Sequence, residues 1–294
     1  MPEMLLLGLC SHRTLTGMSR IAQILKPDII IDRKGEGSEK DYDGIIAHNH
    51  FGDPFNGRLP RILYLASYNT ASVATKPANV KLVKNHPPTE IWVNQEMGRQ
   101  LLEKVGLKAR TMYRPNKLEI PAKCPKPPKN RGILWHFHHS DFRMPPNVEK
   151  KIANAMRELS DVKIRIINAD RGGNKWKPKG KGLDHVDADG FLNLRKEMPN
   201  WHGIVRIYQA PQNLDHGRST FQAFAYGRWY ICRKSREPFV TSVDTIADVV
   251  PMVRELIDNP DTEAAQARWE YARSQFAEDI LHDKWVAAVK RVIN

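Results

Sequence analysis

The 294-residue sequence has few cysteines, a deficit of acidic residues and no long apolar run. Its three cysteines, Cys10, Cys124 and Cys232, are far apart, which fits neither a disulfide framework nor a zinc site. The longest apolar runs, such as Met4–Leu9, have the length of strands, which excludes a membrane-spanning helix. The first residues also lack the features of a secretory signal. These absences predict a cytoplasmic protein, in the host cytoplasm if a phage encodes it.

The charge is strongly positive. Lysine and arginine number 46 against 33 aspartates and glutamates, which gives a formal net charge of +13. Such an excess attracts polyanions, namely nucleic acid, an anionic membrane surface or phosphorylated substrates, although it also suits a protein whose charge serves only solubility. The excess is spread over both halves of the chain, which excludes a basic tail as its source.

Short apolar runs alternate with helix-like segments in both halves of the sequence. Continuous Ile and Leu runs separated by helices are typical of parallel strands that are buried on both faces. A helix is expected over Gly17–Lys26, and another begins at an Asn94 N-cap and ends at Gly106. The strands expected in the first half are Met4–Leu9, Asp28–Asp32, Gly44–Ala47, Arg61–Ala66, Glu90–Val93 and Ala109–Tyr113.

The same alternation of apolar runs and helix-like segments resumes after a segment rich in proline and lysine. The composition of that segment predicts an extended, solvated connector. We therefore expect an α/β protein of two Rossmann-like domains that face a cleft, where ligands bind beyond the carboxyl ends of the strands. The expected boundaries are 1–120 for the first domain, 121–131 for the linker, 132–275 for the second domain and 276–294 for a C-terminal helix. In the second half, strands are expected at Gly132–Phe137, Val162–Ile167, Gly203–Tyr208 and Trp229–Cys232, a long loop at Asp170–Gly190, and helices at Thr245–Asp258 and Thr262–Ile293.

The most informative segment is 215–232, DHGRSTFQAFAYGRWYIC. Ser219 is placed as the N-cap of a short helix to Tyr226, and Gln222 completes a capping box. The free amides and positive dipole end of this helix suit a diphosphate, and an ordinary capped helix is the alternative.

This segment resembles the signature of GT-B glycosyltransferases of the family-4 type, with residues 222–227 (QAFAYG) at the position of their E-A-x-A-x-G motif. Residues 42–50, 90–114 and 132–159 resemble further parts of that family in order. The resemblance implies a first domain on the acceptor side, a second domain that binds a nucleotide sugar such as UDP-glucose, a last helix that packs back on the first domain, and no bound metal or other cofactor. The sequence departs from the family's glutamate pair, because Gln222 occupies the second position and Leu214 the first.

The resemblance also places the reacting groups. Catalytic or orienting roles fall to His48, His50 and Asp53, because an acceptor proton must be removed and two histidines two residues apart share a side on an extended segment. Arginines offset the charge of the leaving diphosphate. The donor-binding residues implied are Gly17, His138, Arg143, Asp215, Arg218, Ser219, Thr220 and Gln222.

Two segments superficially suggest a metal site. The run Trp135–Asp141 (WHFHHSD) matches no established zinc spacing, and Asp187-Ala188-Asp189 lies in the charged loop with no apolar strand before it. We therefore expect no metal site.

The chemistry predicted is transfer of a sugar from a nucleotide sugar to a hydroxyl group, most concretely of a hydroxymethylated pyrimidine in double-stranded DNA. The alternatives are a peripheral-membrane or cell-wall polysaccharide glycosyltransferase, and a nucleic-acid-binding protein of the same fold without catalysis. The residues expected to contact nucleic acid are basic and surround one aromatic ring: Arg171, Lys175, Trp176, Lys177, Lys179 and Lys181.

Overall fold

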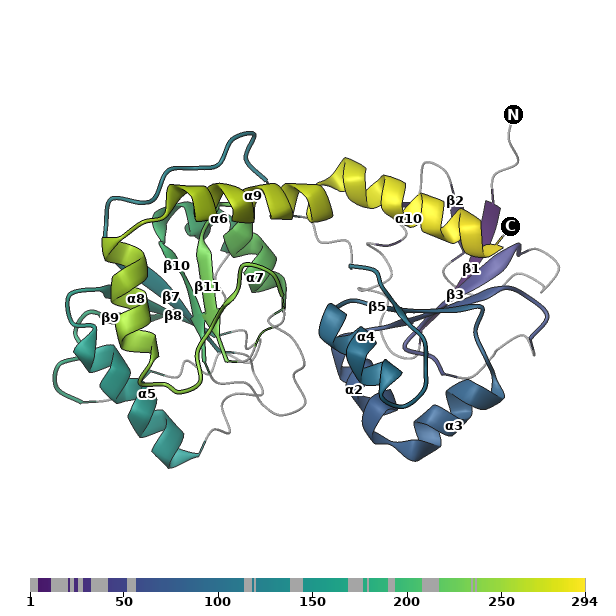
Figure 1. Cartoon of the computed structure of the whole chain (residues 1–294), viewed down its shortest axis with the longest axis horizontal. Coiled ribbons are helices and arrows are strands. Elements are labelled where there is room, and N and C mark those ends of the chain that lie inside the picture. The colour runs from purple at the N-terminus through teal and green to yellow at the C-terminus, as the bar shows by residue number, and fades with distance from the viewer. Residues whose placement is uncertain are drawn as a thin grey trace. The chain divides into compact units, whose positions relative to one another are not determined.

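The computed structural model contains two compact units, each built on one parallel six-stranded sheet (Figure 1). The first unit comprises Met1–Lys117 and Gln275–Asn294, and the second comprises Leu118–Ser274. The predicted α/β class with parallel sheets is confirmed. The structure describes residues 5–11, 21, 24–25, 29–32, 42–51, 57–113, 118, 120–137, 145–168, 177–178, 180–189, 194–207, 217–233, 235 and 237–293.

The strands of the first sheet follow the apolar runs of the sequence, with ends that agree with the expected ones to within two residues, and for Glu90–Val93 both ends coincide. Their order across the sheet is β2-β1-β3-β4-β5-β6, and every pair is parallel. All residues of the two central strands β3 and β4 are buried, as continuous apolar runs require. The strands are β1 (Leu5–Ser11), β2 (Ile29–Asp32), β3 (Gly44–His48), β4 (Arg61–Leu65), β5 (Glu90–Val93) and β6 (Arg110–Thr111).

Three helices connect the later strands of this sheet. The sequence patterns did not indicate α2 (Ser67–Thr75) and α3 (Pro77–Asn85), and neither has a side-chain N-cap. The third, α4 (Glu96–Glu103), was expected, but its N-cap is Gln95 and not Asn94. Gly106 lies beyond its end at φ +74°, in the left-handed region that glycine adopts without strain, as predicted.

The long helix expected over 262–293 is two helices, α9 (Thr262–Phe276) and α10 (Glu278–Ile293). The second of them packs on the first sheet through Trp285, whose side chain is fully buried. Its ring makes edge contacts with Tyr64 and Trp92, at centroid distances of 5.5 and 5.3 Å, and its Nε1 donates to the Tyr113 carbonyl oxygen at 3.0 Å. The core of the first unit thus includes α10, which follows the second unit in the sequence.

The second sheet has the order β12-β11-β10-β7-β8-β9, again with parallel pairs only. Its edge strand β9 occupies part of the segment expected to be a loop. The strands are β7 (Gly132–Phe137), β8 (Lys163–Asn168), β9 (Val186–Asp189), β10 (Gly203–Arg206), β11 (Trp229–Cys232) and β12 (Thr241–Ser242). The helices are α5 (Pro146–Glu158), α6 (Leu194–Glu197), the 3-10 helix η3 (Met198–Asn200), α7 (Gly217–Phe224), α8 (Val249–Asp258) and the greater part of α9.

The proline-rich segment after residue 120 packs against the second unit and does not run free in solvent. Trp269 Nε1 donates to the Pro121 carbonyl oxygen at 3.0 Å, and Arg228 Nη2 donates to that of Lys126 at 2.8 Å. Proline cannot donate from its backbone nitrogen, but its carbonyl and those of its neighbours still accept hydrogen bonds. The guanidinium of Arg228 is buried by this packing, and the burial lowers its pKa to about 10.

Candidate functional site

The two faces of the second sheet differ in polarity. Side chains alternate along a strand, and on one face Trp135, Val205 and Ile231 pack against α5 and α8 in an apolar core. The register pairs Ile204 with both Leu134 and Tyr230, so the opposite face carries Tyr230 and, one step nearer the carboxyl ends, His136 and Arg206. Polar groups therefore gather on one face, toward the end of the sheet where ligands bind in parallel α/β folds.

The first turn of α7 contacts this polar face. Ser219 Oγ lies 3.2 Å from His136 Nδ1 and 3.3 Å from the Tyr230 hydroxyl oxygen. Ser219, Thr220, Arg206 and Tyr230 are all less than 4% exposed. Burial raises the pKa of Tyr230 to about 12, against the charge of Arg206 and the hydrogen bond with Ser219, which lower it. The tyrosine is thus a neutral hydroxyl held in a hydrogen-bonded cluster.

The expected capping box is wrong. Helix α7 begins at Gly217, two residues before Ser219, so Ser219 is a residue of the first turn and not the N-cap. Its hydroxyl is directed to His136 and Tyr230 because those partners lie on the strands below the helix. The amides of the first turn nevertheless have no acceptor within the helix, and the positive end of the helix dipole lies at this cluster. An anion is the ligand that such an arrangement stabilises.

The other donor-site predictions fall partly on α7. Thr220 is buried, Gln222 is half-buried, and Arg218 is a residue of the first turn. Gly17, His138, Arg143 and Asp215 lie outside the described residues. His136, Arg206 and Tyr230 were not predicted as site residues from the sequence. The pattern in the sequence that could have identified them is that each interrupts an otherwise apolar strand, at positions that face the same way.

In the first unit, His48 is the last residue of β3 and is 7% exposed. Its ring stacks on that of Tyr64, with 5.7 Å between the ring centroids. Its Nε2 accepts a hydrogen bond from Asn49 Nδ2 at 3.2 Å. Asn49 has a φ of +55°, and its Oδ1 accepts from the Ala66 amide at 2.8 Å, which joins the ends of β3 and β4. The extended backbone assumed for His48 and His50 is therefore interrupted between them, and the argument that they share a side is wrong.

The remaining predicted residues are only partly described. His50 is half-buried, and Asp53 lies outside the described residues. Lys177 and Lys181 are exposed, as a nucleic-acid contact requires. Arg171, Lys175, Trp176 and Lys179 also lie outside the described residues.

The Asp187–Asp189 segment belongs to strand β9, so its placement in a loop was wrong. The side chain of Asp187 faces a cation, because its Oδ2 lies 4.0 Å from Lys163 Nζ on the neighbouring strand. Among the described residues, no cluster of three His, Cys, Asp or Glu side chains is arranged to hold a metal ion. None of the described helices is both long enough and apolar enough to cross a membrane.

No family model and no curated protein matches this sequence. Solved structures do match. HepE of Anabaena in complex with UDP and glucose has a TM-score of 0.64 at 14% identity, over 98% of this chain and 100% of that chain. A glycosyltransferase from Rickettsia africae has a TM-score of 0.60 at 10% identity, over 100% of both chains. The pneumococcal O-GlcNAc transferase GtfA in complex with UDP and GlcNAc has a TM-score of 0.51 at 12% identity, over 80% of this chain and 53% of that chain. The fold is that of GT-B glycosyltransferases, and the resemblance seen in the sequence is confirmed at this level.

Proposed function

We propose that the protein is a glycosyltransferase that moves a sugar from a UDP-sugar donor to a hydroxyl acceptor. The observation that carries the proposal is the hydrogen-bonded cluster of buried Ser219 and Tyr230 with half-buried His136 under the first turn of α7, on a fold shared over 98% of the chain with UDP-bound HepE. The cluster fixes the start of a helix whose amides suit a diphosphate. The two-domain cleft that the family resemblance implies is itself part of this proposal.

In the proposed reaction, the bond between the sugar C1 and the diphosphate oxygen breaks, and its electron pair leaves with UDP. The acceptor oxygen forms the new bond to C1 and loses its proton to a base. The first turn of α7, with Arg218 and Arg143, offsets the charge on the leaving diphosphate. Gln222 binds a ribose hydroxyl, and His48, His50 and Asp53 are the candidates for orienting or deprotonating the acceptor.

Nucleotide binding tests the donor half of the proposal. UDP at 100 times its Kd should stabilise the protein by about 2.7 kcal/mol, which a thermal shift detects, and AMP serves as the control nucleotide. The Arg143→Ala substitution should lower turnover at least about tenfold, through the loss of a charge-assisted contact. Arg254→Ala is the matched control, because Arg254 is exposed on α8, which packs on the opposite face of the sheet. If no nucleoside diphosphate gives a shift, the proposal is wrong, and a nucleic-acid-binding protein without catalysis is favoured.

For the acceptor, we propose a hydroxymethylated pyrimidine in double-stranded DNA. The support is the net charge of +13, together with exposed Lys177 and Lys181 in the basic segment. The test is transfer of radiolabelled glucose from UDP-glucose to duplexes that differ only in the hydroxymethyl group. Label on the modified duplex alone supports the DNA acceptor, and label on neither contradicts it.

A second acceptor setting has an observation of its own. Two exposed lysines, Lys81 and Lys84, line an apolar hollow on the first unit, which suits a glycosyltransferase that works at a membrane or on a cell-wall polysaccharide. Transfer of label to a lipid-linked or polysaccharide acceptor, without label on DNA, favours this setting.

A further inference from the structure

One segment of the first unit carries positive charge only. Between Asp53 and Glu90 the sequence contains no acidic residue. The cations in the same interval are Arg58, Arg61, Lys76, Lys81 and Lys84. The chain as a whole has 33 acidic residues in 294, so an interval of this length without any of them is a local feature and not the average composition.

The three lysines of this segment are exposed. Lys76 lies between α2 and α3, and Lys81 and Lys84 lie on α3. In the described part of the chain, none of the three forms an ion pair with a carboxylate. The carboxylates of nearby α4 are engaged elsewhere, because Glu96 and Glu103 both bind Arg99. The positive charge of α3 is therefore available to an external anion.

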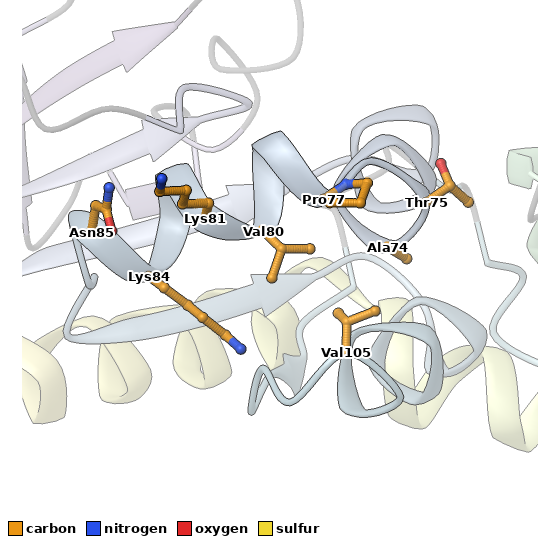
Figure 2. Close-up of a pocket in the computed structure, with 8 residues that line it drawn as sticks. All are labelled: Ala74, Thr75, Pro77, Val80, Lys81, Lys84, Asn85 and Val105. Atoms are coloured by element: carbon orange, nitrogen blue, oxygen red, sulfur yellow. The ribbon is translucent and has the colours of Figure 1, made fainter.

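Two of these lysines, Lys81 and Lys84, border a hollow of about 500 Å³, which we call the α3 hollow (Figure 2). Figure 2 shows Val80 and Val105 pointing toward each other across it, with Lys84 extending beside them. A Cβ added at Gly106 would lie 3.6 Å from Lys84 Nζ, so the lysine reaches the chain beyond α4. The residues that line the α3 hollow are Ala74, Thr75, Pro77, Val80, Lys81, Lys84, Asn85 and Val105.

We propose that the α3 hollow and its lysines are a docking surface for an anionic lipid bilayer. The ammonium groups would contact lipid headgroups, while the aliphatic lining would receive apolar parts of the lipid. Nucleic acid fits less well, because the lining has no aromatic ring on which a base stacks and no arginine fork for a phosphate. The proposal does not depend on sugar transfer, because all residues of the hollow belong to the first unit, whereas α7 belongs to the second.

Cosedimentation with lipid vesicles tests the proposal. The whole protein should partition onto vesicles that contain phosphatidylglycerol and not onto pure phosphatidylcholine. The K81E/K84E variant should lose at least about tenfold in partitioning, since each lysine near an anionic surface contributes measurably. The K150E/K151E variant is the matched control, because Lys150 and Lys151 are exposed neighbours on α5 and the change in net charge is identical. It should stay within about twofold of the natural protein.

A second variant tests the hollow itself. Ala74→Phe fills the space without changing charge, and it should weaken partitioning most at high salt, where the headgroup attraction is screened. The proposal is overturned if the natural protein ignores anionic vesicles, if both double variants lose binding equally, or if duplex DNA is retained while vesicles are not. A UDP-induced thermal shift measured on the same samples shows whether the proposed glycosyltransferase function stands separately.

Discussion

Ser219 Oγ lies 3.2 Å from His136 Nδ1, which joins the first turn of α7 to strand β7. The same oxygen lies 3.3 Å from the hydroxyl of Tyr230 on β11. One hydroxyl thus connects a helix to two strands of the sheet, and it does so where the helix dipole is positive. The position of the proposed phosphate site depends on this connection.

The Ser219→Ala variant should therefore be less stable and should bind UDP more weakly. Removing the hydroxyl leaves the buried Tyr230 and the half-buried His136 with fewer hydrogen bonds, which costs about 1–3 kcal/mol in the free energy of unfolding. Urea unfolding and a UDP titration measure the two effects. Ser274→Ala is the control, because Ser274 is exposed and its hydroxyl donates to the Tyr271 carbonyl oxygen within the same helix. Equal behaviour of the two variants would show that the cluster has no such role.

Tyr230 should make stability depend on pH in the alkaline range. An unfolded tyrosine loses its proton near pH 10, whereas burial raises the pKa of Tyr230 to about 12. Between these values the folded state binds more protons, so this contribution is complete below pH 10 and is lost as the pH rises toward 12. In Tyr230→Phe the free energy of unfolding should fall less steeply, by up to about 3 kcal/mol over this range. Urea unfolding at pH 9, 10 and 11 gives the slopes, and parallel slopes would contradict the prediction.

Trp285 should be essential for the first unit. Trp285→Ala removes a fully buried ring and its hydrogen bond to Tyr113, which should cost about 3–5 kcal/mol. Lys290→Ala, an exposed change on the same helix, should stay within about 0.5 kcal/mol. Thermal unfolding compares the two. A small effect of the alanine at 285 would mean that α10 contributes little to the core.

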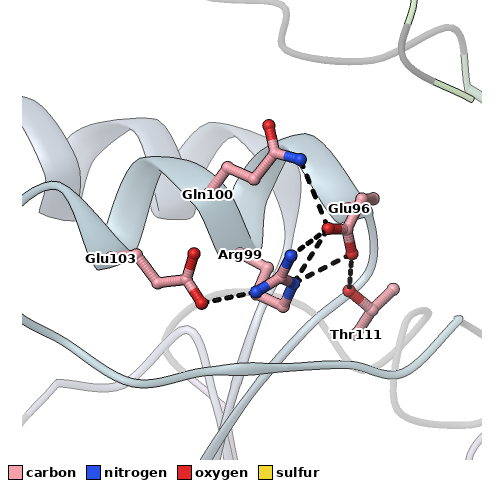
Figure 3. Close-up of polar contacts among 5 residues, drawn as sticks. All are labelled: Glu96, Arg99, Gln100, Glu103 and Thr111. Carbon is pink, nitrogen blue, oxygen red and sulfur yellow. Dashed lines mark hydrogen bonds and ion pairs between the residues drawn. The ribbon is translucent and has the colours of Figure 1, made fainter.

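Glu96 should contribute a small stability that is sensitive to acid. Arg99, Gln100 and Thr111 all donate to its carboxylate, and Arg99 also binds Glu103 (Figure 3). The hydrogen bond from Arg99 is the main reason that the pKa of Glu96 lies below its ordinary value. The contribution of Glu96 to stability is complete at pH values above its pKa in the unfolded state. It is lost as the pH falls through its lower pKa in the folded state.

The Glu96→Gln variant should therefore show a weaker loss of stability between about pH 5 and pH 3. The difference should be under about 1 kcal/mol, because the Glu96 side chain is about one-third exposed and solvent screens its charge. Glu263→Gln is the control, since Glu263 is an exposed acid in the first turn of α9. Acid titration of unfolding would contradict the prediction if the two variants had the same profile.

Much of the fold could be predicted because its strands correspond to continuous apolar runs in the sequence. Residues 132–137 and 229–232 were delimited correctly for this reason. Helices α2 and α3 were missed because their sequence offers no capping side chain and little apolar periodicity. The break between α9 and α10 was missed because apolar residues continue across it.

The site was less predictable, because its members depend on register. His136 and Tyr230 share a face only because β7 and β11 both pair with β10 in a particular alignment, which a single sequence does not encode locally. Ser219 was identified, but for a capping role that it does not have. The positive φ of Asn49, which separates His48 from His50, occurs together with a hydrogen bond that Asn49 Oδ1 accepts from the amide of Ala66, just beyond β4, and this long-range contact cannot be recognised from the sequence.

The burial of Trp285 against Tyr64 and Trp92 has a consequence for the order in which the protein matures. Synthesis on the ribosome releases the strands of the first unit before the second unit, yet the helix that completes their core follows the second unit in the sequence. The second unit can be completed before the first. Until then the nascent first unit exposes aromatic rings, which is the stage at which a chaperone would engage it.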